Sequence, residues 1–144
     1  MSLYGIFDIA GSGMSAQSVR LNTTASNLAN AQSVSSSVDS TYRARHPIFA
    51  AAMQDAMGGD FASAGSEAGR GVQVMGIIED QSPYQMRYEP SHPMADEKGY
   101  VAYPNVNVVE EMVNMITASR SYDAGVTVMK TISGMAKNAL NIGG

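Results

Sequence analysis

The 144-residue chain contains neither cysteine nor tryptophan, and only nine of its residues are lysine or arginine. Without cysteine it forms no disulfide, has no thiolate nucleophile and builds no cysteine-based zinc site. Its net charge is −4, so there is no basic surface to hold nucleic-acid phosphates. These absences exclude cysteine chemistry and disfavour a nucleic-acid partner.

Charged residues make up 15% of the chain, against about 25% in an ordinary globular domain. Large core-forming side chains are also scarce, with four leucines and three phenylalanines, whereas methionine occurs eleven times. Low hydrophobicity with a high net charge would predict disorder, but a net charge of −4 is too small for that. We therefore expect a chain that completes its apolar burial against other chains.

The first 19 residues contain no lysine or arginine and no sustained apolar run. A cleavable secretory signal needs a basic start and an apolar core, and a transmembrane helix needs a longer apolar run. We therefore expect any route out of the cytoplasm to be independent of such a signal, and we expect no insertion into lipid.

Two segments show the seven-residue spacing of a coiled-coil seam. The first covers residues 3–31 and has Asn30 as a suitable end, and the second runs from Asn107 to about residue 143. Asn107 with Glu110 resembles a capping box. A second line on the C-terminal helix is formed mostly by small residues, namely Ala118, Gly125, Ile132 and Ala139. The predicted coiled-coil and subunit-contact residues are Phe7, Met14, Leu21, Asn27, Leu28, Asn30, Val108, Met112, Met115, Tyr122, Val126, Met129 and Leu140.

Between these helices the hydrophobic period changes to two, which predicts strands. Alternation over 72–78 and 84–88 predicts a β-hairpin, and 42–49 and 100–103 are further candidate strands. The predicted fold is mainly α with a small β insertion. Its predicted parts are an N-terminal helix (1–33), a central β and loop region (34–104) and a C-terminal helix (105–144), the two helices pairing as a coiled coil. The Ala- and Gly-rich segment 50–71 is predicted to be a flexible loop.

Catalytic chemistry has few candidates in this sequence. His46 and His92 each precede a proline, and Asp96 lies near the second, which leaves open a metal site or a hydrolase. Turn residues are the favoured interpretation, and Glu110 and Glu111 are favoured as partners of the helix dipole. No nucleophile motif or phosphate-binding loop is present. We therefore predict no enzyme activity, metal or cofactor.

Several short sequence segments resemble segments of a known protein family. Ser15–Asn22 and Ala25-Ser-Asn-Leu-Ala-Asn-Ala31 resemble the N-terminal signature of bacterial flagellar rod and hook axial proteins. Tyr88-Glu-Pro90, Gly99-Tyr-Val101 and the run from Glu111 to Tyr122 resemble the proximal rod members of that family. Asp123-Ala-Gly125 departs from the family pattern, and we expect Gly125 to loosen the helix there.

The resemblance implies a structural subunit of the flagellar basal-body rod. Such a subunit is exported by the flagellar type III apparatus without signal cleavage and assembles in the periplasm. There it polymerises into a helical tube that transmits torque and forms the export-channel wall. The implied partners are further copies of the chain, the rod proteins FlgB, FlgF and FlgG, the rod-base adaptor FliE, and MS-ring and P-ring components. Another rod or hook axial protein is the nearest alternative.

Overall fold

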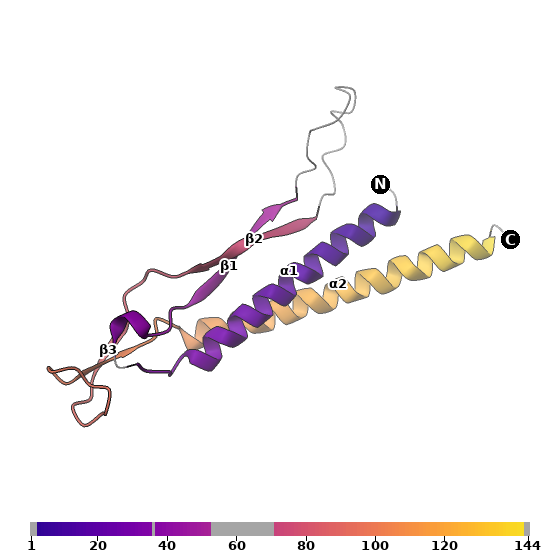
Figure 1. The fold of residues 1–144 in the computed structure, drawn as a ribbon. Coiled ribbons are helices and arrows are strands. Elements are labelled where there is room, and N and C mark those ends of the chain that lie inside the picture. The colour runs from indigo at the N-terminus through magenta and orange to yellow at the C-terminus, as the bar shows by residue number, and fades with distance from the viewer. Residues whose placement is uncertain (1–2, 36, 53–70, 143–144) are drawn as a thin grey trace, which may run out of the picture. The chain divides into compact units, whose positions relative to one another are not determined.

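The computed structural model describes residues 3–35, 37–52 and 71–142 of the chain. A long N-terminal helix, α1 (Leu3–Asn30), and a long C-terminal helix, α2 (Val108–Ile142), enclose the other elements in sequence (Figure 1). Between them lie a short 3-10 helix, η1 (Val38–Ser40), and the strands β1 (Arg45–Ala51), β2 (Val72–Glu79), β3 (Gln85–Tyr88) and β4 (Tyr100–Tyr103). The fold is mainly helical with a β insertion, as the sequence predicted.

The helix ends follow from local chemistry. The Asn107 side-chain oxygen accepts hydrogen bonds from the backbone N–H groups of Val109 (3.2 Å) and Glu110 (3.4 Å). These two donors have no carbonyl partner within the helix, so Asn107 acts as the predicted N-cap of α2. At the C-terminal end of α1, the N–H of Ser33 bonds to the Asn30 carbonyl at 3.0 Å. This tightened turn ends α1 at the asparagine the sequence indicated.

The strand pairing differs from the prediction. The strands form two separate two-stranded sheets, β1 with β2 and β3 with β4, so the predicted hairpin of 72–78 with 84–88 is wrong. The β3–β4 pair is antiparallel, with Gln85 opposite Tyr103 and Tyr88 opposite Tyr100. Beyond the end of β2 the Asp80 N–H still bonds to the Ala44 carbonyl at 2.7 Å. The chain after β2 is therefore held by the segment that enters β1 and does not fold back onto β2.

The segments between the helices and strands are only partly described by the structure. Most of the predicted loop 50–71 lies outside the described residues. Its first two residues, Ala50 and Ala51, belong to β1, and Gly71 directly precedes β2. The Ser-rich stretch 33–40 contains η1. Among the helices that the structure describes, none is both long and apolar enough to cross a membrane.

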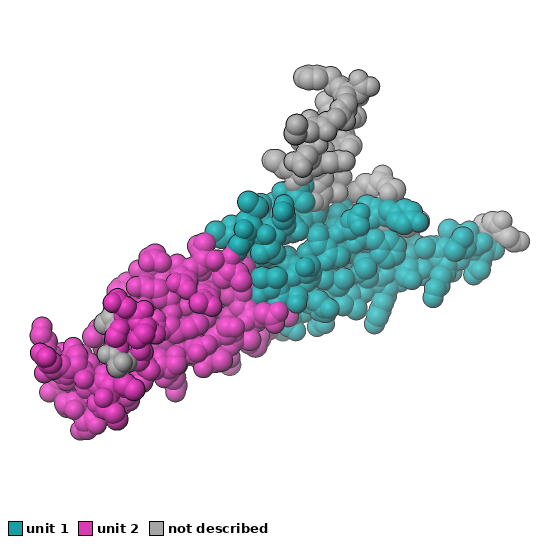
Figure 2. Space-filling model, in the orientation of Figure 1, with its two compact units in different colours: residues 1–19, 48–76, 118–144 teal, residues 20–47, 77–117 magenta. Residues whose placement is uncertain are grey.

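The chain divides into two compact units, coloured separately in Figure 2. Unit 1 comprises residues 1–19, 48–76 and 118–144, and unit 2 comprises residues 20–47 and 77–117. In unit 2 the helices lie antiparallel, because Arg20 bonds to Asn114 (2.7 Å) while the later Asn27 bonds to the earlier Glu111 (3.0 Å). Each unit therefore combines a piece of α1 with a piece of α2.

The buried face of α2 follows the line of small residues. Ala118 and Ile132 are buried, and a Cβ added at Gly125 would lie 2.5 Å from Cγ of Met14. A real Cβ does not approach a neighbour that closely, so any larger residue at position 125 would require the Met14 side chain to move. The expectation that Gly125 loosens the helix stays a prediction. The helix α2 is continuous from Val108 to Ile142 and uses Gly125 for close packing.

Candidate assembly surfaces

The beginning of α2 carries an exposed apolar stripe. Its four members recur at intervals of three and four residues and keep large exposed fractions: Val109 (71%), Met112 (51%), Val113 (58%) and Ile116 (54%). Successive helical residues are about 100° apart, so these four share one face and lie opposite the buried face that carries Ala118. An apolar face directed away from its own unit is typical of a contact with another chain.

The predicted contact residues fall into three groups in the structure. Asn27 is fully buried. The half-buried group is Phe7, Met14, Leu21, Leu28, Asn30, Met115, Val126 and Met129. The exposed group is Val108, Met112, Tyr122 and Leu140. Their role as subunit contacts stays a prediction, and most of them keep surface that a neighbouring chain would cover.

In unit 1 an apolar groove brings two of the predicted residues together. Phe7 and Leu140 line it with Tyr4, Ala136 and Ala139, and its volume is about 390 Å³. The N-terminal part of α1 and the last turns of α2 thus form one apolar surface within this unit. Tyr4 and Leu140 are among the most exposed apolar side chains that the structure describes.

Unit 2 contains a polar junction centred on Asn27. The Asn27 amide nitrogen donates to the Arg45 carbonyl (2.8 Å) and to the Glu111 carboxylate (3.0 Å). Its oxygen accepts from the Arg45 N–H (2.9 Å) and from the Tyr42 hydroxyl (2.8 Å). A primary amide has two donors and two main acceptor positions, so every one of them is used. The side chain pairs with both backbone groups of Arg45 as a neighbouring strand would.

A second asparagine, Asn105, binds the residue that precedes Arg45. The Asn105 oxygen accepts from the Ala44 N–H at 2.8 Å, and its nitrogen donates to the carbonyls of Asp80 and Ser82, each at 3.1 Å. Ala44 is buried. The chain entering β1 is therefore tied to α1 through Asn27 and to the segment just before α2 through Asn105.

Two ionisable groups of unit 2 have shifted pKa values. Burial raises the pKa of the Tyr42 hydroxyl, an effect that Arg45 opposes and that the carboxylates of Glu111 and Glu79 reinforce. The hydroxyl therefore keeps the proton that it donates to Asn27. Hydrogen bonds from the Ser82 hydroxyl and the Ser82 N–H lower the pKa of Asp80, with smaller contributions from His46 and Arg43.

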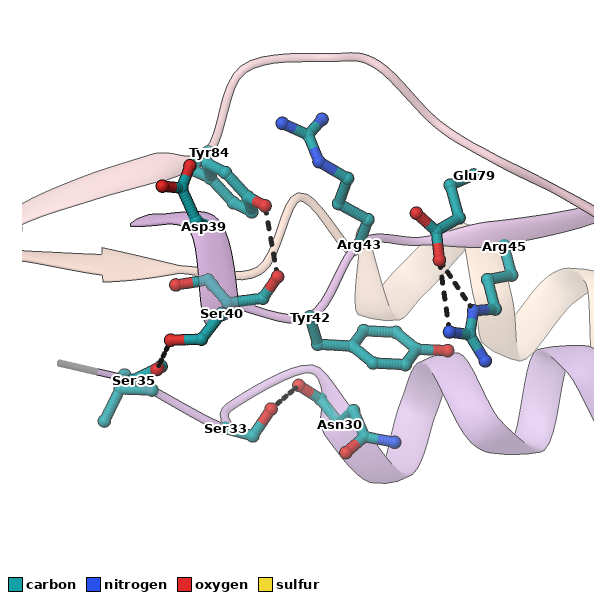
Figure 3. Close-up of a pocket in the computed structure, with 12 residues that line it drawn as sticks. Asn30, Ser33, Ser35, Asp39, Ser40, Tyr42, Arg43, Arg45, Glu79 and Tyr84 are labelled. Carbon is teal, nitrogen blue, oxygen red and sulfur yellow. Dashed lines mark hydrogen bonds and ion pairs between the residues drawn. The ribbon is translucent and has the colours of Figure 1, made fainter. Parts of the chain in front are cut away.

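A polar cavity of about 480 Å³ lies beside this junction. Figure 3 shows the residues that line it. Arg45 and Glu79 point toward each other across one end and form an ion pair of 3.1 Å. At the other end the Tyr84 hydroxyl donates to the Thr41 carbonyl (3.1 Å), and the Arg43 guanidinium lies over the Tyr84 ring, 4.6 Å from its centroid. The polar groups lining the cavity are thus largely bonded to one another, which suits a structural joint.

The histidines and acids considered for catalysis occupy turns and strands. The His92 Nδ1 accepts from the Met94 N–H at 3.1 Å, and the Asp96 carboxylate accepts from the N–H groups of Lys98 (2.9 Å) and Tyr100 (2.8 Å). His46 lies in β1. Among the described residues no group of three or more His, Asp or Glu side chains could hold a metal ion.

The sequence interpretation missed the role of Glu111, which is only 4% exposed. Glu111 precedes Ala118 by seven residues and therefore belongs to the same line as Gly125 and Ile132. Its position on this line, and not its residue type, is the signal that could have predicted its burial. The contacts of Tyr42, Arg45 and Asn105 left no comparable pattern in the sequence.

Comparison with known proteins places this architecture in a family. Residues 7–34 match the family model described as "Flagella basal body rod protein", and residues 97–142 match "Flagellar basal body rod FlgEFG protein C-terminal". The chain is 48% identical over 143 residues to the flagellar basal-body rod protein FlgC of Escherichia coli and of Salmonella typhimurium, with 99% of each chain covered. The chain belongs to the FlgC family of flagellar basal-body rod proteins.

A more distant relative extends the same conclusion. FlgC of Borreliella burgdorferi is 37% identical over 151 residues, covering 99% of this chain and 98% of that relative. The similarity to FlgC proteins therefore includes the central β region, which neither family model covers in full. A FlgC-family chain is a structural subunit of the flagellar basal-body rod, as the resemblance in the terminal strings implied.

Proposed function

We propose that this rod subunit polymerises with other rod proteins into a helical tube that transmits torque and forms the wall of the export channel. The observation that carries the proposal is the exposed stripe of Val109, Met112, Val113 and Ile116. Burying a large apolar side chain contributes about 1.5–3 kcal/mol. Four such side chains on one face provide cohesion that the isolated chain does not use.

The geometry of tube assembly favours contacts between unlike surfaces. A contact that joins two different faces of equivalent subunits, and whose rotation does not close a ring, extends into a helical polymer. This chain has an apolar stripe in unit 2 and an apolar groove in unit 1, which are unlike faces. Chains with two such faces fit a polymer better than a closed dimer.

The helices are proposed to pair as a coiled coil in the inner part of the tube. Support comes from the buried positions Glu111, Ala118 and Ile132, which are separated by multiples of seven residues, and from the antiparallel contacts in unit 2. Small residues on such a line allow helices to approach closely. The β region would then lie outside the helical core of the tube.

Location and partners follow from the same proposal. We place the assembled chain in the periplasmic part of the basal body, after export by the flagellar type III apparatus without cleavage of a signal peptide. Its neighbours would be further copies of itself, FlgB, FlgF, FlgG and FliE, and components of the MS and P rings. The role is structural and involves no enzyme activity, consistent with the use of His92 and Asp96 in turns.

A charge placed in the stripe tests the proposal. Val113→Asp should abolish rod assembly, because an interface that covers Val113 would have to bury an unpaired carboxylate, which is strongly unfavourable. The measurement is the number of rods in basal bodies isolated from cells that carry only the variant chain. Cellular levels of the chain should be unchanged, since Val113 is exposed before assembly.

Ser121→Asp is the matched control. It introduces the same charge at an exposed position of α2 that is turned by about 80° around the helix from Val113 and lies outside the stripe. We expect this variant to assemble rods. Normal rods in the Val113→Asp strain would show that the stripe is not a subunit contact.

A further inference from the structure

The backbone that enters β2 lies directly on α1. Gly71 precedes β2 and has a φ of +61°. A Cβ added at Gly71 would overlap the Ser12 hydroxyl and would lie 3.2 Å from the Ser12 Cβ and 3.7 Å from the Ile9 Cα. Glycine is therefore needed at position 71 for its conformation and for this close approach.

The Ser12 hydroxyl makes this contact directional. Its oxygen accepts from the Val72 N–H at 3.1 Å, and it donates to the Ile9 carbonyl at 2.9 Å. A serine hydroxyl has one donor and can accept as well, so both functions are used. The Gly71 carbonyl accepts from the Ala52 N–H, just after β1, at 3.2 Å. The end of β1 and the start of β2 are thus tied to one turn of α1, and all five residues belong to unit 1.

The turn that carries Ser12 is an intrinsically weak part of α1. Gly11 and Gly13 flank the serine, and glycine inside a helix is less favourable than alanine because it loses more backbone freedom on folding. A Cβ at either position would meet nothing within 4 Å. Packing within the described part of the chain therefore does not require glycine at these two positions, and their effect is to weaken the helix locally.

The residues before this weak turn form one side of the apolar groove. Tyr4 and Phe7 line the groove from α1, opposite Ala136, Ala139 and Leu140 of α2. Tyr4 is 83% exposed, so its own packing contributes little to holding the first turn of α1. The groove exists only while these first turns are helical and in place.

We propose that Ser12 and the backbone of Gly71 and Val72 form a latch that holds residues 3–10 of α1 in place. Gly11 and Gly13 allow these residues to separate from the rest of the helix when the latch opens. The apolar groove is then present only in the latched chain, so the position of β2 controls a surface formed by the helices. The use of that surface in the rod rests on the proposed function, whereas the latch itself does not.

Hydrogen exchange of the purified full chain tests the latch through the sign of an effect. Ser12→Ala introduces a better helix former, so a serine with no holding role would give slower exchange of the backbone amides of residues 7–10. Loss of the latch instead predicts exchange at least about tenfold faster in this segment. Ser15→Ala is the matched control, because Ser15 is exposed on the same helix, and it should not accelerate exchange. Unchanged or slower exchange in Ser12→Ala would overturn the inference.

A substitution on the strand side should have the same effect. Gly71→Ala should accelerate exchange of the same amides, because the new methyl group overlaps the Ser12 hydroxyl. Combining Gly71→Ala with Ser12→Ala should be no worse than the stronger single variant, since both changes remove one contact. Additive effects of the two substitutions, or an α1 that is unaffected by Gly71→Ala, would show that this contact does not hold residues 3–10.

The glycines are tested by stiffening the helix. Gly11→Ala with Gly13→Ala should slow exchange of residues 7–10 by about tenfold, and adding Ser12→Ala should then have a smaller effect than it has in the unmodified chain. An equal effect in both backgrounds would contradict the role of the glycines.

The link to the groove is tested by counting rods in isolated basal bodies. Ser12→Ala should lower their number by about twofold or more, because fewer chains present the groove, while Ser15→Ala leaves it unchanged. Faster exchange together with a normal number of rods would overturn the control of assembly by the latch. That result would leave the proposed assembly intact, since Val113→Asp tests it separately.

Discussion

The two units hold their helices together by different means. In unit 1 the contact is close and apolar, with Met14 against Gly125 and a groove lined by Phe7 and Leu140. In unit 2 the contact is made by side-chain hydrogen bonds, from Arg20 to Asn114 and from Asn27 to Glu111. Apolar contacts are non-directional and tolerate sliding, whereas buried hydrogen bonds require one geometry. The parts of α1 and α2 in unit 1 therefore provide apolar cohesion, and the parts in unit 2 fix how the two helices are aligned.

The largest expected effect comes from a charge placed in the apolar packing of unit 1. Ala118→Asp puts a carboxylate at a position that is 0% exposed, with an expected loss of about 3–5 kcal/mol in the free energy of unfolding. Urea unfolding of the purified chain and a count of rods in isolated basal bodies would both register it. Ala124→Asp is the control, because Ala124 is exposed on the same helix. Equal effects of the two variants would contradict close packing at Ala118.

A smaller effect tests how closely the two helices pack in unit 1. Gly125→Ala should destabilise the chain by about 1–2 kcal/mol, because the new methyl group overlaps Met14. Gly134→Ala is the matched control, since a Cβ there meets nothing within 4 Å, and it should stabilise the helix by about 0.5–1 kcal/mol. The two shifts in the urea midpoint should have opposite signs. Stabilisation by both variants would show that Met14 moves aside without cost.

The smallest expected effect concerns a hydrogen bond in unit 2 and is measured as a change in the pKa of Asp80. The pKa of Asp80 is lowered chiefly by the Ser82 hydroxyl, at 2.6 Å, and then by the Ser82 N–H. A lowered pKa in the folded chain contributes stability above the ordinary carboxyl pKa, and this contribution is lost as the pH falls through the folded value. Ser82→Ala should raise the pKa of Asp80 toward its ordinary value, as followed by NMR titration of the carboxyl group.

The control for this titration is Ser33→Ala. The Ser33 hydroxyl donates to the Asn30 carbonyl, far along the chain from Asp80. The pKa of Asp80 should therefore be unchanged in that variant. An Asp80 titration that is the same in Ser82→Ala and in the unmodified chain would show that the Ser82 hydroxyl does not lower the pKa of Asp80.

The helices could be predicted from the sequence because their signals are local. Seven-residue spacing and the asparagines at 30 and 107 lie within or beside the elements they define. Strand positions were also readable from alternation, but their pairing was not. The partner of β2 is β1, which precedes it across the segment 53–70, and no local pattern reports which strand will be the neighbour.

The candidate site shows the same limit. Asn27 was predicted as a contact residue, yet its four hydrogen bonds join three separate segments of the chain. Such a network depends on where distant residues meet, so spacing along one helix does not reveal it. Glu111 is the exception, since its place on the line of Ala118 and Gly125 was visible in the sequence.

The exposed stripe on α2 also has a consequence for the chain before it reaches the rod. Val109, Met112, Val113 and Ile116 are accessible in the single chain, and apolar patches of this kind promote self-association as concentration rises. We therefore expect a threshold concentration above which free subunits aggregate in solution. Polar substitutions that raise this threshold should weaken rod assembly by a corresponding amount, because solubility and polymerisation depend on the same four side chains.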